Sequence, residues 1–116
     1  MQFKSIIGQK ELISNLTTSF KENRVAHTQL FLGDEGYGAL PLAIAYSQFL
    51  LCTNKQSDDS CGVCPSCKKF DKYAHPDLHF YFPTATNQTI KKNPKSSLAL
   101  DVWRNYLIEN NAYITL

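Results

Sequence analysis

The sequence predicts an α/β fold, because a strand, a glycine-rich turn and a helix follow one another. Residues 28–32 are a short run of mainly apolar and aromatic side chains, typical of a buried strand. Residues 40–51 are apolar all round, which predicts a buried helix. The turn between them contains Gly33, Gly36 and Gly38. This order is the context of a nucleotide-binding phosphate loop, and equally of a plain strand-to-helix turn.

The glycine turn has the spacing of a phosphate loop but lacks its two reactive side chains. A working loop places a Lys and then a Ser or Thr directly after its last glycine, to contact the phosphates and Mg²⁺. Ala39 and Leu40 stand at these positions, and Asp34 and Glu35 add negative charge. The loop amides still offer a weakened anion cradle. We therefore predict no ATP hydrolysis and weak or no nucleotide binding at the three glycines.

The four cysteines of the chain lie in one short stretch. They are Cys52, Cys61, Cys64 and Cys67. Two overlapping Cys-x-x-Cys steps and a fourth thiol at the end of the predicted helix suit tetrahedral Zn²⁺. Two disulfides, a redox pair and an iron–sulfur cluster are the alternatives. We predict structural zinc, because four protein ligands leave no open position for a catalytic water.

The length and the charge of the chain exclude several classes of protein. The chain has 116 residues, a net charge of +2 and 19% charged residues, which indicates one domain at most and no strongly basic nucleic-acid binder. Neither a bilayer-spanning stretch nor a signal-peptide pattern is present, so we expect a cytoplasmic protein. The ending 111–116 is typical of the approach to a strand, and indicates a fragment.

Two further helices are predicted outside the central region. Residues 8–20 have an amphipathic pattern, with an apolar stripe suited to core packing. Its members are Leu12, Ile13, Leu16 and Phe20. Residues 98–109 form the second helix, and Trp103, Tyr106 and Leu107 share one of its faces. No Ser-His-Asp, Cys-His or paired-carboxylate arrangement indicates a catalytic site.

The region after the cysteines is expected to be mixed. Residues 68–73 continue a short helix, whose lysines Lys68, Lys69 and Lys72 suit a solvated face better than a nucleic-acid contact. Within residues 75–83, a turn at 75–76 leads into an aromatic strand. We interpret His75 and His79 as structural, since the cysteines already saturate one zinc. Residues 84–97 are expected to form a flexible polar loop.

These elements together resemble the amino-terminal part of bacterial DNA polymerase III clamp-loader subunits. The resemblance covers residues 3 to 83 in the family's order, and the cysteine module directly after the phosphate-loop helix is its most specific part. The matching elements are residues 6–9, residues 27–33, the glycine loop, the four cysteines and residues 75–78.

The resemblance implies an AAA+ fold, a parallel sheet flanked by helices, for residues 1–116, with a zinc module inserted at about 52–73. It places Ile6 and Ile7 near the adenine position of the family. Ala39 and Leu40 make the chain similar to the delta-prime kind of subunit, which often has a degenerate loop, rather than to the active gamma/tau ATPase. The implied role is that of a silent partner to gamma/tau and delta, helping to load the sliding clamp on primed DNA.

Two other functions stay open, and the fold itself raises a question. The chain could be an active ATPase subunit of the gamma/tau kind, or a zinc-dependent nucleic-acid binding module. In the family, later strands lie between the first two strands of the sheet. A fragment without them would have unpaired edges, so we expect the isolated piece to be marginal or to self-associate. The family's arginine finger lies beyond residue 116.

Overall fold

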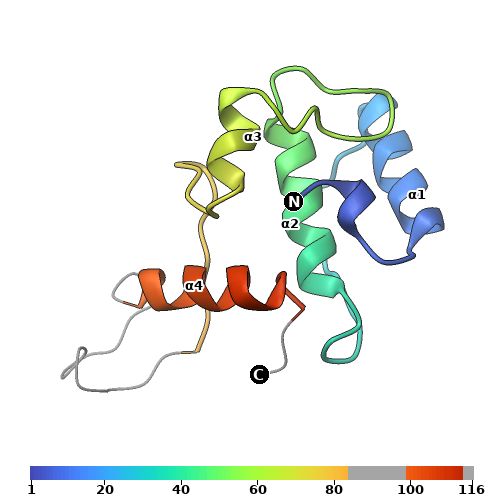
Figure 1. Cartoon of the computed structure of the whole chain (residues 1–116). Helices are drawn as coiled ribbons and strands as arrows, with labels where there is room; N and C mark the ends of the chain where they lie inside the picture. Colours follow the sequence, from blue (N-terminus) through green and yellow to red (C-terminus); the bar gives the residue numbers. More distant parts are fainter. Residues whose placement is uncertain (84–98, 114–116) are drawn as a thin grey trace.

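Helices provide the regular structure in the part of the chain that the computed structural model describes, residues 1–83 and 99–113. They are the short 3-10 helix η1 (Phe3–Ser5) and the helices α1 (Lys10–Lys21), α2 (Ala39–Leu51), α3 (Pro65–Phe70) and α4 (Leu100–Asn110). Helix α2 lies at the centre, with α1 on one side and α3 and α4 on the other (Figure 1). Within residues 1–83 and 99–113, none of the helices combines the length and the apolar character that crossing a bilayer requires.

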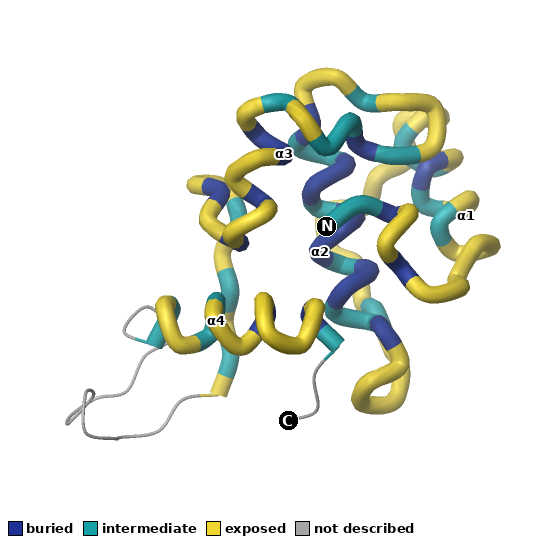
Figure 2. The backbone as a smooth tube through the Cα atoms, in the orientation of Figure 1, coloured by how far each residue is buried: buried dark blue, intermediate teal, exposed yellow. Residues whose placement is uncertain are grey.

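Helix α2 is buried because both of its faces meet apolar neighbours, as its continuous apolar sequence predicts. On one face, Ala45 and Phe49 join Phe3 and Ile6 in a first core. On the other face, Ile44 joins a second core. The other buried members of the second core are Phe70, Tyr73, Leu107 and Ala112. Figure 2 shows the contrast between this buried helix and the exposed loops around it.

Helix α1 covers the first core with most of its predicted stripe. Ile13, Leu16 and Phe20 pack against that core, and the Phe20 ring meets the Phe49 ring edge-on at 5.3 Å. Leu12 is 49% exposed, so the prediction that it belongs to the buried stripe is wrong. At 100° per residue, Leu12 falls at the margin of the stripe, on the side away from Ile13.

The two predicted strands and the parallel sheet are not found among the described residues. Residues 28–32 and 79–82 follow irregular paths without a ladder partner. Leu30 and Leu32 are 82% and 88% exposed, which contradicts a buried strand. The physical reason is that a strand forms only when another strand accepts and donates its backbone hydrogen bonds. The described segments supply none beside either run.

The remaining helices lie close to their predicted places. Helix α3 begins at Pro65 and ends at Phe70, so only the first part of the predicted 68–73 helix is helical and the rest is turn. On the predicted face of α4, Leu107 is fully buried and the Trp103 ring stacks on Phe82 at 4.4 Å. Tyr106 lies beside Trp103 but is 36% exposed, so this face is only partly buried. The polar loop predicted at 84–97 lies outside the described residues, as do residues 114–116 of the predicted strand approach.

Candidate metal centre and glycine loop

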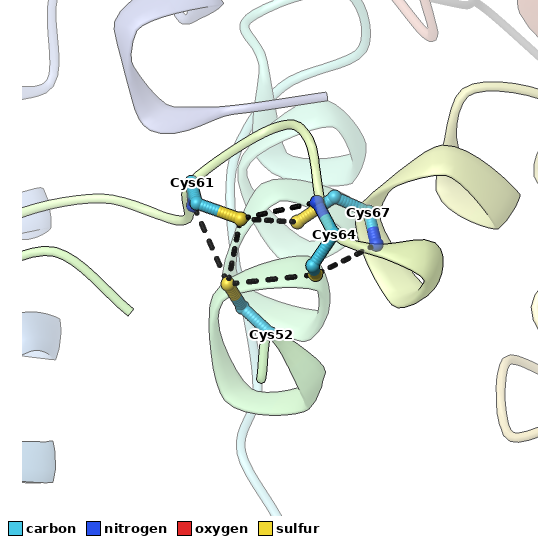
Figure 3. Close-up of side chains that lie close together, drawn as sticks. All are labelled: Cys52, Cys61, Cys64 and Cys67. Atoms are coloured by element: carbon cyan, nitrogen blue, oxygen red, sulfur yellow. Dashed lines mark hydrogen bonds between the residues drawn. The ribbon is translucent and has the colours of Figure 1, made fainter. Parts of the chain in front are cut away.

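The four cysteines come from three neighbouring pieces of chain. Cys52 directly follows the last residue of α2, Cys61 lies in the connecting loop, Cys64 caps the start of α3, and Cys67 lies within α3. Their sulfur atoms all lie within 4.8 Å of one another (Figure 3). The polar connector and the start of α3 therefore return the chain to the end of α2.

The distances between the sulfurs suit one tetrahedral ion. The Sγ of Cys52 lies 3.6 Å from that of Cys61 and 3.9 Å from that of Cys64, and the sulfurs of Cys61 and Cys67 are 4.0 Å apart. A tetrahedral site with Zn–S bonds of ~2.3 Å has sulfurs about 3.8 Å apart. All four cysteines are free of disulfides. An iron–sulfur cluster places several atoms among its thiolates, and this spacing leaves room for a single ion.

Backbone amides point at the sulfurs and favour their ionised form. Cys61 N–H donates to the Cys52 sulfur at 3.3 Å, and Cys64 N–H donates to the Cys61 sulfur at 3.3 Å. Cys67 N–H donates to the Cys64 sulfur at 3.4 Å, which also caps the N-terminus of α3. Such donors spread the negative charge of a thiolate and orient the ligand. The site is thus built for anionic sulfur.

The pKa values of two thiols move in opposite directions. Burial raises the pKa of Cys64, but hydrogen bonds from Thr53 and from the Cys67 amide outweigh burial and lower it to about 5. Burial raises the pKa of Cys67 to about 12, with the neighbouring thiols of Cys64 and Cys52 adding to the rise. Without a cation, the cluster therefore keeps protons that a divalent ion would displace.

Two side chains that sequence reasoning missed hold the end of α2 beside this cluster. Ser66 Oγ donates to the carbonyl of Leu51 at 2.9 Å, and Lys55 Nζ donates to the carbonyl of Cys52 at 2.7 Å. The same ammonium lies 5.2 Å from the centre of the Phe20 ring. Carbonyls at a helix C-terminus lack partners within the helix. Lys after a predicted helix end was the one available signal.

The glycine loop forms the turn that leads into α2. Gly36 and Gly38 have φ values of 79° and 99°, which side chains with a Cβ rarely adopt. Gly38 is the N-cap of α2, and a Cβ on it would lie 3.1 Å from the ring of Tyr113. Gly33 has no such requirement, since the nearest atom to its Cβ position is 4.0 Å away. At Gly38, backbone conformation and close packing both require glycine.

A cavity of about 280 Å³ opens beside the loop, and its chemistry is unfavourable for a phosphate. Its walls are the glycine loop, residues 80–83, Trp103 and Tyr113. Asp34 and Glu35 line it, whereas no Lys or Arg is among the described residues at its wall. Ala39 and Leu40 occupy the positions where a cation and a hydroxyl would be needed.

The histidines and lysines singled out in the sequence are not members of the cysteine cluster. His75 is buried, its ring is 5.1 Å from Phe70, and its Nδ1 accepts from the Asp77 amide at 3.0 Å. His79 is exposed. The three lysines of residues 68–72 are also exposed. Among the described residues, the four cysteines form the one group of potential ligands that converges.

Comparison with known proteins gives a consistent group of relatives. A family model described as DNA polymerase III, delta subunit, matches residues 8–112. The chain is 32% identical over 76 residues to DNA polymerase III subunit tau/gamma of Haemophilus influenzae, which covers 66% of this chain and 11% of that protein. It is 32% identical over 75 residues to subunit delta' of Escherichia coli, which covers 65% of this chain and 22% of that protein.

A plant protein is also similar. The chain is 33% identical over 70 residues to protein STICHEL of Arabidopsis thaliana, covering 60% of this chain and 6% of that protein. The match therefore spans between 6% and 22% of the length of these three relatives. No solved structure matches the chain.

Proposed function

The chain belongs to the family of DNA polymerase III delta subunits, and on this premise we propose that it is part of a catalytically silent clamp-loader subunit of the delta-prime kind. The observation that carries the proposal is the pair Ala39 and Leu40 in the glycine loop. A phosphate loop that turns over ATP needs a cation and a Mg²⁺-binding hydroxyl at these positions. In this proposal, the loop serves as a connection between elements of an AAA+ nucleotide-binding-like domain, of which residues 1–116 are the N-terminal part.

Charge beside the loop supports the same conclusion. Asp34 and Glu35 line the cavity next to Gly38, so a triphosphate there would face two carboxylates. Charges of the same sign repel, and screening by water and salt at these exposed side chains weakens the repulsion without reversing its sign. The amides of the loop do not carry a full positive charge to offset this repulsion. Nucleotide binding at Gly33, Gly36 and Gly38 is therefore weak or absent.

The test is an ATPase assay on the full-length protein, alone and mixed with a tau/gamma subunit. We expect no Mg-ATP turnover by the protein alone, while tau/gamma alone provides the positive control. A calorimetric titration with Mg-ATP should give no measurable heat of binding. Turnover by the isolated protein, or tight Mg-ATP binding, would contradict the silent assignment.

An active ATPase of the tau/gamma kind is the second candidate. It stays a candidate because the matched tau/gamma and delta' subunits are both 32% identical to this chain. Identity alone therefore does not separate the two kinds, and Ala39 and Leu40 are our reason for proposing the silent kind. The double variant Ala39→Lys, Leu40→Thr has the Lys and the hydroxyl of a working phosphate loop. If the natural loop is silent, this variant should bind Mg-ATP more tightly than the wild-type protein.

We propose that the four cysteines hold one structural Zn²⁺, within a module at about residues 52–73. The support is the sulfur spacing and the amide donors at the sulfurs. The ion would neutralise the thiolates and tie the connector to α2 and α3, and no step of a reaction passes through it. Metal analysis of protein purified without chelators should find about one zinc per chain. Less than half a zinc per chain would contradict the assignment.

The proposed partners follow from the same family. They are the gamma/tau and delta subunits, and, through the complex, the sliding clamp and primed DNA in the cytoplasm. Co-elution of the full-length protein with purified tau/gamma and delta on size-exclusion chromatography tests this. We expect one complex that contains all three, and separate elution would contradict it.

A further inference from the structure

Asp59 joins the cysteine-bearing loop to the N-terminal segment of the chain. Its carboxylate accepts hydrogen bonds from the amide of Phe3 at 2.9 Å and from the amide of Lys4 at 3.2 Å. It also accepts from the amide of Ser60 at 2.8 Å, in its own loop. The first amides of η1 have no partner within the helix. The Asp59 carboxylate therefore caps this helix, although Asp59 lies more than 50 residues from it in the sequence.

A second set of contacts holds the same two segments together. Gln2 Nε2 donates to the carbonyl of Ser60 at 2.7 Å. The Gln2 side chain also lies so close to Gly62 that a Cβ there would be 2.8 Å from it. From the other side, Gln48 Nε2 on α2 donates to Ser60 Oγ at 3.1 Å, and both residues are 1% exposed. Residues 2–4 therefore dock on residues 59–62.

The loop that receives the N-terminal segment has almost no core of its own. Of residues 53–60, Ser60 alone is buried. Cys52 and Cys61 hold the two ends of this stretch, and both belong to the sulfur cluster. A segment that buries little apolar surface cannot offset the entropy of ordering its backbone. The position of Asp59 thus depends on whether the cysteines are held together.

The N-terminal segment in turn supplies part of the first core. Phe3 and Ile6 are 3% and 7% exposed, and the Phe3 ring lies 5.6 Å from that of Phe49. We infer that ion binding at the four cysteines and ordering of residues 2–6 are coupled, with Asp59 as the main link and Gln2 as a second one. The inference rests on the proposed metal and not on clamp loading. Coupling of this kind is reciprocal, so the docked segment also strengthens ion retention.

Hydrogen–deuterium exchange on the full-length protein tests the coupling. Removing zinc with a chelator should raise the exchange rate of peptides covering residues 2–6 at least tenfold, together with those of the cysteine loop. Asp59→Ala should raise exchange over residues 2–6 while zinc content stays near one per chain and α2 keeps its protection. Asp58→Ala is the matched control, because that neighbouring carboxylate is exposed and takes no part in these contacts.

Competition with a chromophoric chelator supplies a second readout. Asp59→Ala should lose zinc to the chelator several-fold more readily than wild type, and Asp58→Ala should not. Protein that carries zinc but shows unchanged exchange over residues 2–6, after chelation or in Asp59→Ala, would overturn the coupling alone. Protein that carries no zinc would overturn the metal site and the coupling with it. The clamp-loader assignment is tested separately, by the ATPase and co-elution assays. Its failure can therefore be told apart from a failure of the metal site or of the coupling.

Discussion

The cysteine cluster and the glycine loop lie at opposite ends of α2, and they differ in what their residues provide. The cysteines provide ligand atoms, and the glycines provide a backbone conformation. At the C-terminal end, the ligand atoms themselves converge within 4.8 Å. At the N-terminal end, Gly38 has the positive φ of the turn, and Ala39 and Leu40 stand where a working phosphate loop has a Lys and a hydroxyl. Metal binding depends on side-chain atoms, whereas a tight turn before a helix depends on backbone dihedral angles. The glycine at position 38 therefore has a role in the fold that does not depend on any ligand.

The largest expected effect is at the cysteine end. Cys67→Ser removes a fully buried ligand, and oxygen is a poor substitute for a thiolate on zinc. Structural zinc contributes on the order of 10 kcal/mol of binding free energy, so zinc content should fall to near zero and the thermal midpoint should drop sharply. Ser57→Ala, in the exposed part of the connector, is the control. A Cys67→Ser protein that keeps its zinc would refute the ligand assignment.

Acidity should act on the same end of the helix. Zinc must displace the proton of Cys67, whose pKa is raised to about 12, but not that of Cys64, whose pKa is lowered to about 5. Zinc affinity therefore decreases as the pH falls, because more thiols hold protons that must be released. At pH 7, fewer than four protons should leave per zinc bound by the folded protein. Calorimetry in buffers of different ionisation enthalpy measures this number, and release of four would contradict it.

A smaller effect is expected at the glycine end. Gly38→Ala places a Cβ at positive φ and 3.1 Å from Tyr113, and should lower the free energy of unfolding by about 1–2 kcal/mol. Gly33→Ala should change it little, since its Cβ would have space. Chemical denaturation of both variants measures the difference. Equal stabilities would show that the loop no longer needs its glycine for the fold.

What could be predicted from the sequence was local. The spacing of Cys61, Cys64 and Cys67 indicated a common centre, and the apolar run at 40–51 gave α2 to within one residue at its start. Each signal lies within a short, continuous stretch of the sequence. Their geometry needs no distant partner, since the capping sulfur of Cys64 and Pro65 at the first position already favour a helix there.

What could not be predicted depended on distant partners. The apolar character of residues 28–32 resembles that of a strand, but a strand also needs a neighbouring strand. The described residues provide no such neighbour, and Leu30 and Leu32 are exposed. Asp59 was missed for the same reason. A carboxylate in a polar connector gives no sign that it will bind the amides of Phe3 and Lys4.

The packing of α2 on both faces has a mechanical consequence. A helix with thirteen residues is about 20 Å long. Because Ala45 and Ile44 are locked into different cores, the helix cannot roll about its own axis without opening both of them. We therefore expect the two ends of α2 to move together rather than independently. Helix α2 thus connects the cysteine cluster and the glycine loop, which have no residue in common.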